Sequence, residues 1–308
     1  MSVLAEQRRL GDAAELRRQR LIGIALMCIA VLCFSCLDTT AKFLNTRMTT
    51  LEVVWARYAS AFLLALIVAN PVSRPGLMVT SRPVLQIVRS ALLLVSTMLG
   101  FLALRFLRLD QTMTILFSTP FFVAALSGPF LNEWVGWRRW TAIAIGFLGV
   151  LVVIRPGLAG MHPAALLSLA GAVLYAFYNI ATRVLARTDS TQTTLFYSNL
   201  VGALALLPVL PFVWTTPTET VVILLMVLMG FLGAFGQYLL IVAIRLAPPM
   251  MLSPFIYTQL VWSILLGYLV FGDVPDRWTL VGGAIVVASG LYMLYREQKV
   301  ATIRRKRS

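Results

Sequence analysis

The sequence predicts an all-α polytopic membrane protein with ten transmembrane helices, arranged as two inverted five-helix repeats. Hydrophobic residues make up 59% of the 308 residues and charged residues only 12%, whereas soluble domains average about 25% charged. The mean hydropathy is +0.86. The second half of the chain also repeats the polar pattern of the first half. Composition therefore predicts the membrane class, and the duplication predicts the two repeats.

Ten apolar stretches are long enough to cross a bilayer, since a spanning helix needs about 20 residues. They lie at residues 20–44, 51–70, 84–104, 109–131, 138–154, 163–184, 192–214, 220–244, 249–271 and 278–295. The loops between them are mostly too short to hold a soluble domain. We expect a basic N-terminal tail over residues 1–20, one repeat over 21–155, a second over 163–295, and a basic C-terminal tail over 296–308.

The two halves are related by an offset of 141 residues. At this spacing Asp38 and Lys42 correspond to Asn179 and Arg183. Solenoid repeats have periods of about 20 to 50 residues, so the offset indicates a duplicated half-protein. Because each half has an odd number of helices, the second half enters the membrane from the opposite face. This is the inverted-repeat plan of many secondary transporters.

The net charge of +14 follows the rule that cytoplasmic loops carry the basic residues. With a cytoplasmic N-terminus, 19 of the 26 lysines and arginines fall on the cytoplasmic side, Arg89 among them. The sequence therefore predicts a bacterial inner-membrane protein with both termini in the cytoplasm. The lipid bilayer accounts for this charge distribution, and nucleic acid is not expected as a partner.

Two charged residues should lie at similar depth in the first two helices, Asp38 and Arg57. A charge in the hydrocarbon region costs at least ~2.5 kcal/mol unless it is paired or wetted, so we expect these two to pair, with Lys42 as the competing partner. Two interpretations of Asp38 remain open. It is either half of a buried pair that joins two helices, or a group that contacts a solute or binds a coupling proton.

Further candidate solute contacts are polar or aromatic residues within the apolar stretches. They are Tyr175, Asn179, Gln237, Tyr257, Gln259 and Trp262. Each alone is more often an interhelical contact than a ligand contact, but together they predict an aromatic-rich cavity for an organic solute. Pro120 and Pro254 lie in corresponding helices and should interrupt them. Such interruptions indicate the binding region of a transporter and a gating role, or a permanent kink with a packing role.

The sequence lacks the residue patterns that catalysis or metal binding would need. The single histidine, His162, is in a loop, and the three cysteines lie together in the first helix without a zinc-ligand spacing. No nucleophile and base pair or HExxH motif is present. We therefore expect no enzyme activity, no metal site and no cofactor.

Several segments carry a family resemblance. They are Ala103-Leu-Arg105-Phe-Leu before the helix with Pro120, and Pro254-Phe-Ile-Tyr-Thr-Gln259-Leu-Val-Trp262 leading to Phe271-Gly-Asp273-Val-Pro275. With them the chain resembles the drug/metabolite transporter superfamily, in its EamA-domain branch, over nearly its whole length. Asp273 stands where that family commonly has Glu, which keeps the charge.

The resemblance implies a secondary carrier that moves a small organic solute through a central cavity by alternating access. Cys36-Leu-Asp38-Thr-Thr-Ala-Lys42 is similar to a subgroup that includes riboflavin transporters. We therefore expect transport of riboflavin or a related aromatic solute, coupled to a proton or driven by the solute gradient. An exporter of amino acids, drugs or metabolites is the alternative, and a channel or structural membrane protein is a more distant one. Monomer and homodimer both remain open.

Overall fold

The computed structural model describes residues 2–69, 79–131, 136–156, 162–247 and 249–307. Within these ranges the regular structure is entirely helical. In chain order the helices are α1 (Ser2–Leu44), α2 (Thr50–Ala69), α3 (Pro83–Leu104), α4 (Leu109–Leu116), α5 (Thr119–Leu131), α6 (Trp137–Ile154), α7 (Ala164–Leu185), α8 (Thr191–Ala205), α9 (Leu210–Val213), α10 (Thr220–Leu246), α11 (Pro249–Ile256), α12 (Thr258–Phe271) and α13 (Arg277–Arg307).

Nine segments of the described chain are long and apolar enough to cross a membrane. The predicted fold class, a polytopic helical bundle, is confirmed. The expected crossing over residues 192–214 consists of α8, with 15 residues, and the four-residue α9. At 1.5 Å per residue, α8 spans about 22 Å, which is less than the ~30 Å hydrocarbon core.

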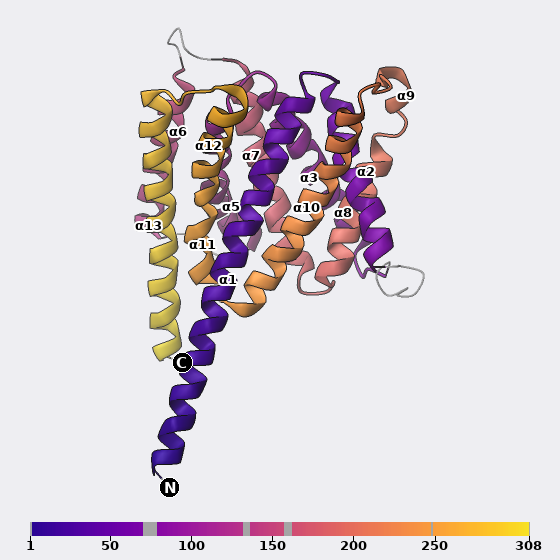
Figure 1. Cartoon of the computed structure of the whole chain (residues 1–308). Helices are drawn as coiled ribbons and strands as arrows, with labels where there is room; N and C mark the ends of the chain where they lie inside the picture. Colours follow the sequence, from indigo (N-terminus) through magenta and orange to yellow (C-terminus); the bar gives the residue numbers. More distant parts are fainter. Residues whose placement is uncertain (1, 70–78, 132–135, 157–161, 248, 308) are drawn as a thin grey trace.

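The long helices alternate in direction, so the start of α1 and the end of α13 lie at the same end of the bundle (Figure 1). We call this the terminal end and the opposite one the far end. At the terminal end lie the starts of α3, α6 and α8 and the ends of α7 and α10. At the far end lie the α1–α2 turn, α9, and the segment between α12 and α13.

Two helices are interrupted at corresponding places in the two halves. One crossing divides into α4 and α5 around Phe117 and Ser118, just before Pro120. The other divides into α11 and α12 at Tyr257, three residues after Pro254. Proline lacks the N–H that would continue the hydrogen-bond ladder and its ring clashes with the preceding turn, so each break falls within three residues of a proline.

The main helix pairs join the two halves of the chain. α1 packs along α10, α3 along α7, and α6 along α13. Small residues allow the closest approaches in lipid. A Cβ atom on Gly149 of α6 would lie 2.9 Å from the carbonyl oxygen of Gly282 of α13. The halves are therefore interleaved, and the space between them is bordered by helices from both.

Candidate solute-binding cavity

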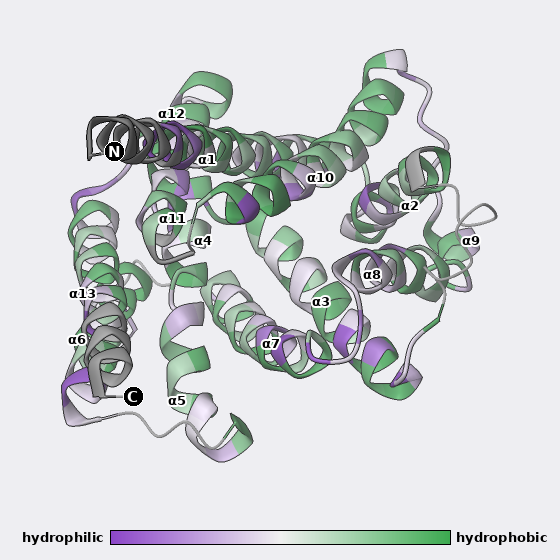
Figure 2. Ribbon diagram, turned by 90° about the horizontal axis from the view of Figure 1, so that it is seen from below, coloured by the Kyte–Doolittle hydropathy of each residue, from purple (hydrophilic) through white to green (hydrophobic). Residues whose placement is uncertain are grey.

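A cavity of about 2300 Å³ lies between the two halves. Figure 2 looks at the bundle from the terminal end, where α1, α10, α3, α7 and α5 surround this region. Of the residues that the structure describes, five arginines line the mouth there: Arg138, Arg139, Arg183, Arg245 and Arg296. At the far end the lining consists of buried residues, Phe101, Leu104, Thr112 and Met113. The cavity thus opens at the terminal end.

One wall of the cavity carries a guanidinium group without a carboxylate partner. Arg57 of α2 donates a hydrogen bond to Thr97 Oγ1 of α3 at 3.1 Å, and the Thr97 hydroxyl also lies 2.9 Å from that of Tyr58. The guanidinium lies over the rings of Tyr58 and Phe101, at 5.2 and 5.6 Å from their centroids. Among the described residues, no carboxylate oxygen lies within 4.0 Å of Arg57.

Among the described lining residues, the carboxylate belongs to Asp38 of α1. Its Oδ2 accepts a hydrogen bond from Gln259 Nε2 of α12 at 3.3 Å, and both residues line the cavity. The expected ion pair between Asp38 and Arg57 is wrong for this structure as a direct contact: Arg57 donates to Thr97, and it acts on the Asp38 carboxylate electrostatically from beyond ion-pair distance. Lys42, the competing partner, binds Asp273 instead.

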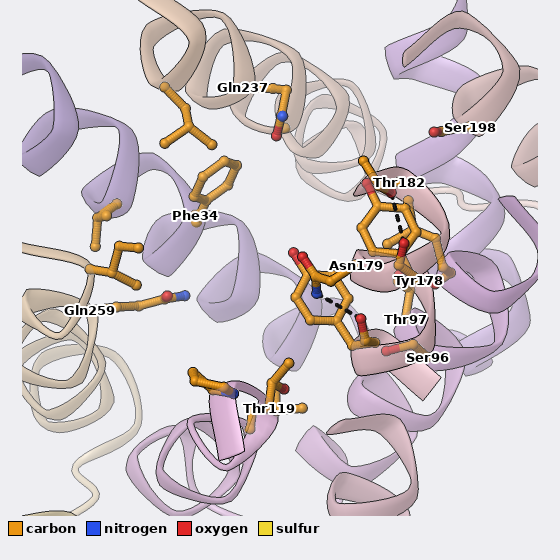
Figure 3. A pocket seen from close by; sticks show the side chains of 18 of the residues that line it. Phe34, Ser96, Thr97, Thr119, Tyr178, Asn179, Thr182, Ser198, Gln237 and Gln259 are labelled. Carbon is orange, nitrogen blue, oxygen red and sulfur yellow. Dashed lines mark hydrogen bonds between the residues drawn. The ribbon is translucent and has the colours of Figure 1, made fainter. Parts of the chain in front are cut away.

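Figure 3 shows how the polar side chains face one another across the cavity. Gln259 and Phe34 lie on one side, and Thr97 and Tyr178 on the other. Tyr178 stacks on Tyr175, with ring centroids 5.2 Å apart and an interplanar angle of 20°. The pair presents aromatic surface at the height of the polar groups.

Asn179 and Gln237 also line the cavity, as does Pro120. The Asn179 amide nitrogen donates to the Tyr175 carbonyl of its own helix at 2.6 Å, which leaves the side-chain oxygen as an acceptor for a solute. Gln237 comes from α10, on the wall opposite α7 (Figure 3). Of the eight solute contacts predicted from the sequence, six line the cavity: Asp38, Arg57, Tyr175, Asn179, Gln237 and Gln259.

The other two predicted contacts, Tyr257 and Trp262, lie outside the lining and are corrected to packing positions. Tyr257 is buried and meets the ring of Phe117 edge-on, at 5.2 Å. Trp262 packs on an apolar cluster that includes Met27. Pro254 is likewise not among the lining residues, which places its effect in the helix break and not in direct contact with a solute.

Arg89 is a functional candidate that sequence reasoning missed. The sequence predicts only that it lies on the cytoplasmic side, and the structure shows its side chain fully buried behind the cavity wall. It donates to the Thr194 carbonyl at 2.6 Å and to Ser198 Oγ at 2.5 Å, and its guanidinium lies 5.1 Å from the ring centroid of Tyr178. The only signal in the sequence is its place as the sixth residue of the apolar stretch 84–104.

Ion pairs between the two halves close the far end. Lys42 Nζ lies 2.6 Å from Asp273 Oδ2, and Arg47 lies 2.7 Å from Glu219. Asp276 pairs with Arg108, at 3.8 Å, and with Arg155. These four pairs each join a residue of the first half to one of the second.

Asp276 is the common acceptor of two of these pairs. Burial alone raises the pKa of its carboxyl, but hydrogen bonds from Thr279 and the contact with Arg155 outweigh burial and lower it. The group therefore stays ionised at neutral pH, which keeps the ion pairs of the far end in place.

Comparisons with known proteins agree with this arrangement. The model of the EamA-like transporter family matches the chain twice, at residues 21–155 and 162–296. An S-adenosylmethionine uptake transporter of Rickettsia conorii is 30% identical over 91% of this chain and 94% of its own. A riboflavin transporter of Vibrio cholerae is 28% identical over 92% and 96%, and a pseudopaline exporter of Pseudomonas aeruginosa 25% identical over 87% and 94%.

The fold is also found among solved structures. One crystal structure with 16% sequence identity superposes with a TM-score of 0.60, covering 89% of this chain and 95% of the other. At that identity the likeness concerns the fold alone.

Proposed function

The chain belongs to the EamA-like transporter family, and on that premise we propose that it carries a small organic solute across the bacterial inner membrane by alternating access. The apolar helices and the related transporters make it a multi-pass membrane transporter. The observation that carries the mechanism is the one-sided cavity. It is open at the terminal end, and ion pairs between the halves bridge it at the far end.

In this proposal the solute binds about halfway through the bundle, where the polar and aromatic side chains gather. Movement of one half against the other breaks the far-end ion pairs and closes the mouth, as expected for inverted repeats around a fixed site. Asp38, Arg57, Asn179, Gln237 and Gln259 supply the polar contacts, and Tyr175 supplies ring surface. Pro120 and Pro254 supply the helix breaks at which the halves deform.

The terminal end is the cytoplasmic side in this proposal. Basic residues favour the cytoplasmic face of a membrane protein, and the mouth of the cavity holds five arginines. The structure then represents the inward-open state. Asp38 is the carboxylate in the cavity that is available to bind a coupling proton.

The names of the related transporters suggest two candidate substrates, S-adenosylmethionine and riboflavin. Riboflavin also agrees with the Cys36–Lys42 segment, and the aromatic pair Tyr175 and Tyr178 suits either ring system. The relatives include both uptake and export proteins, so the direction of flux is an outcome of the experiment.

The proposal is tested with the full-length protein in proteoliposomes, using labelled S-adenosylmethionine and labelled riboflavin on either side of the membrane. A carrier gives saturable flux and exchange of internal for external solute, whereas a channel gives flux that rises linearly with concentration. Linear flux, or flux equal to that of empty liposomes for both solutes, would exclude the proposal. An Asp38→Ala protein that folds and transports normally would remove Asp38 from the mechanism.

A further inference from the structure

The charges of the cavity are separated onto two walls. The wall formed by α2 and α3 carries Arg57, and Arg89 lies directly behind Tyr178 on the same side. The wall formed by α1 and α12 carries Asp38 with its donor Gln259. In the described chain neither Arg57 nor Asp38 has an ion-pair partner within 4.0 Å.

We propose that this two-walled charge pattern selects an amino acid whose side chain carries a second, cationic centre, and that S-adenosylmethionine fits it while riboflavin does not. In this assignment, which rests on the proposed transport function, Arg57 binds the α-carboxylate and Asp38 faces the side-chain cation. A ring attached to that cation lies against Tyr175 and Tyr178.

The Arg57 side chain is suited to a carboxylate. Its contact with Thr97 fixes the guanidinium, and this contact uses one of its five N–H donors. The rings of Tyr58 and Phe101 border the group and limit its access to water. A guanidinium binds a carboxylate through two parallel hydrogen bonds, and the charge of Arg89 adds to the positive potential of this wall.

The Asp38 side chain is suited to a cation that has no hydrogen to donate. Gln259 supplies a hydrogen bond to one carboxylate oxygen. Lys42, one turn away on α1, is bound to Asp273 and makes no ion pair with Asp38, and Arg57 acts on the Asp38 carboxylate only from beyond ion-pair distance. A sulfonium ion needs nearby negative charge and makes no hydrogen bond, so an otherwise unpaired carboxylate provides what it requires.

The separation of the walls decides between the two cations of S-adenosylmethionine. Its α-ammonium and α-carboxylate share one carbon, so both lie at the Arg57 end. The sulfonium is separated from that carbon by two methylene groups, and in this assignment it faces the second wall. Riboflavin carries neither a carboxylate nor a cation, and its binding would leave both charged groups without a partner, which is unfavourable within a membrane.

The test measures equilibrium binding to the purified full-length protein with labelled S-adenosylmethionine and three competitors. Decarboxylated S-adenosylmethionine lacks the carboxylate, S-adenosylhomocysteine lacks the sulfonium charge, and riboflavin lacks both. We expect decarboxylated S-adenosylmethionine to bind about 10- to 100-fold more weakly than S-adenosylmethionine, the range for one hydrogen bond to a charged group. S-adenosylhomocysteine, which loses the attraction between its charge and Asp38 but no hydrogen bond, should bind roughly fivefold more weakly. Equal affinity for all four compounds would overturn the proposal.

Variants show which wall of the cavity is responsible for each loss of affinity. Arg57→Gln should lower the affinity for S-adenosylmethionine to that of the decarboxylated compound and leave the latter unchanged. Asp38→Asn should remove the preference over S-adenosylhomocysteine. Arg105→Gln, which removes an exposed guanidinium outside the cavity lining, should keep all the preferences. If Arg57→Gln does not fold, Arg57→Lys and the competitor series on the unaltered protein decide the question.

Failure of this assignment is distinct from failure of transport. Saturable riboflavin flux without binding of S-adenosylmethionine would overturn the assignment and leave the carrier function standing. Selective binding as predicted, without saturable flux of either compound in proteoliposomes, would keep the two subsites and overturn the carrier function.

Discussion

Lys42 and Asp273 are 231 positions apart in the sequence, and their side chains are joined by a 2.6 Å ion pair. Lys42 lies in the last turn of α1 in the first half, and Asp273 follows α12 in the second. The ammonium also lies 4.6 Å from the ring centroid of Phe271. The contact holds the two halves together at the far end, so opening of that end requires it to break.

Neutralising this pair should move the protein toward a state open at the far end. Lys42→Gln removes an interaction of about 1 kcal/mol for a partly exposed pair, which corresponds to a roughly fivefold change in population. We expect a cysteine introduced at Thr112, on the cavity floor, to react about five times faster with a thiol reagent applied to the far side. The reporter protein lacks Cys28, Cys33 and Cys36.

The charge-swapped protein, with Lys42→Asp and Asp273→Lys together, is the matched control and should return the labelling rate toward that of the parent. Equal rates in the parent and in Lys42→Gln would show that the pair does not hold the far end closed.

Gly230 marks a close approach of α10 to α2, and alanine there should destabilise the fold. The added Cβ would lie 2.1 Å from Ser60 Oγ and 2.6 Å from the backbone nitrogen of Ala61. The backbone at Ala61 cannot change rotamer to make room for the new atom. We therefore expect the free energy of unfolding to fall by about 1 to 3 kcal/mol, typical of overpacking, which is measured as a lower thermal midpoint in detergent. Gly100→Ala, where nothing lies within 4 Å of the new atom, should leave the midpoint unchanged or higher.

Asp189 should make stability depend on pH below 4. Burial alone raises the pKa of this loop carboxyl, but hydrogen bonds from Thr80, Gln86 and Ser81 outweigh it and hold the pKa below the ordinary 3.8. A depressed folded-state pKa gives stability that is complete above the unfolded value and is lost as the pH falls through the folded value. The thermal midpoint of the parent should therefore exceed that of Asp189→Asn at pH 6, and the difference should shrink between pH 4 and pH 3. A difference that stays constant to pH 3 would contradict this.

The helix break at Pro254 should matter for the rate of transport more than for solute affinity. Pro254→Ala restores an N–H and lets α11 and α12 join into a straighter helix. Because Pro254 does not line the cavity, we expect a lower maximal rate with unchanged equilibrium binding. Proteoliposome flux and binding to the purified protein measure the two effects separately. An equal loss of both would indicate that the proline shapes the site itself.

The fold could be predicted from the sequence because each helix is specified by its own residues, independently of the other helices. A run of 20 apolar residues specifies a spanning helix whatever its neighbours are, and the offset between Asp38 and Asn179 shows the duplication directly. The helix breaks could also be predicted, since proline acts on its own backbone. Polar residues inside apolar runs indicated six of the cavity residues for the same reason.

The faces of the helices could not be predicted in the same way. Each residue turns the side-chain direction by about 100°, so Tyr257 and Gln259, two positions apart, point to different neighbours. Which of them meets the cavity depends on how α12 is rotated against α1 and α13, and packing decides that. The predicted ion-pair partner of Asp38 could not be identified for the same reason: Lys42 binds Asp273 and Arg57 donates a hydrogen bond to Thr97. The position of Arg89 predicts only that it lies on the cytoplasmic side, whereas its burial depends on the hydrogen bonds that it donates to Thr194 and Ser198 of α8.

The short helix α8 has a consequence for the surrounding lipid. Its 15 residues cover about 22 Å, so the helical part of this flank is shorter than the ~30 Å hydrocarbon core, and the turn with α9 that follows makes up the rest of the crossing. A bilayer adapts to such a flank by thinning locally, at a cost that grows with each ångström of mismatch. The protein should therefore be most stable in membranes of short-chain lipids, and acyl-chain length becomes a variable that acts on this one sector of its perimeter.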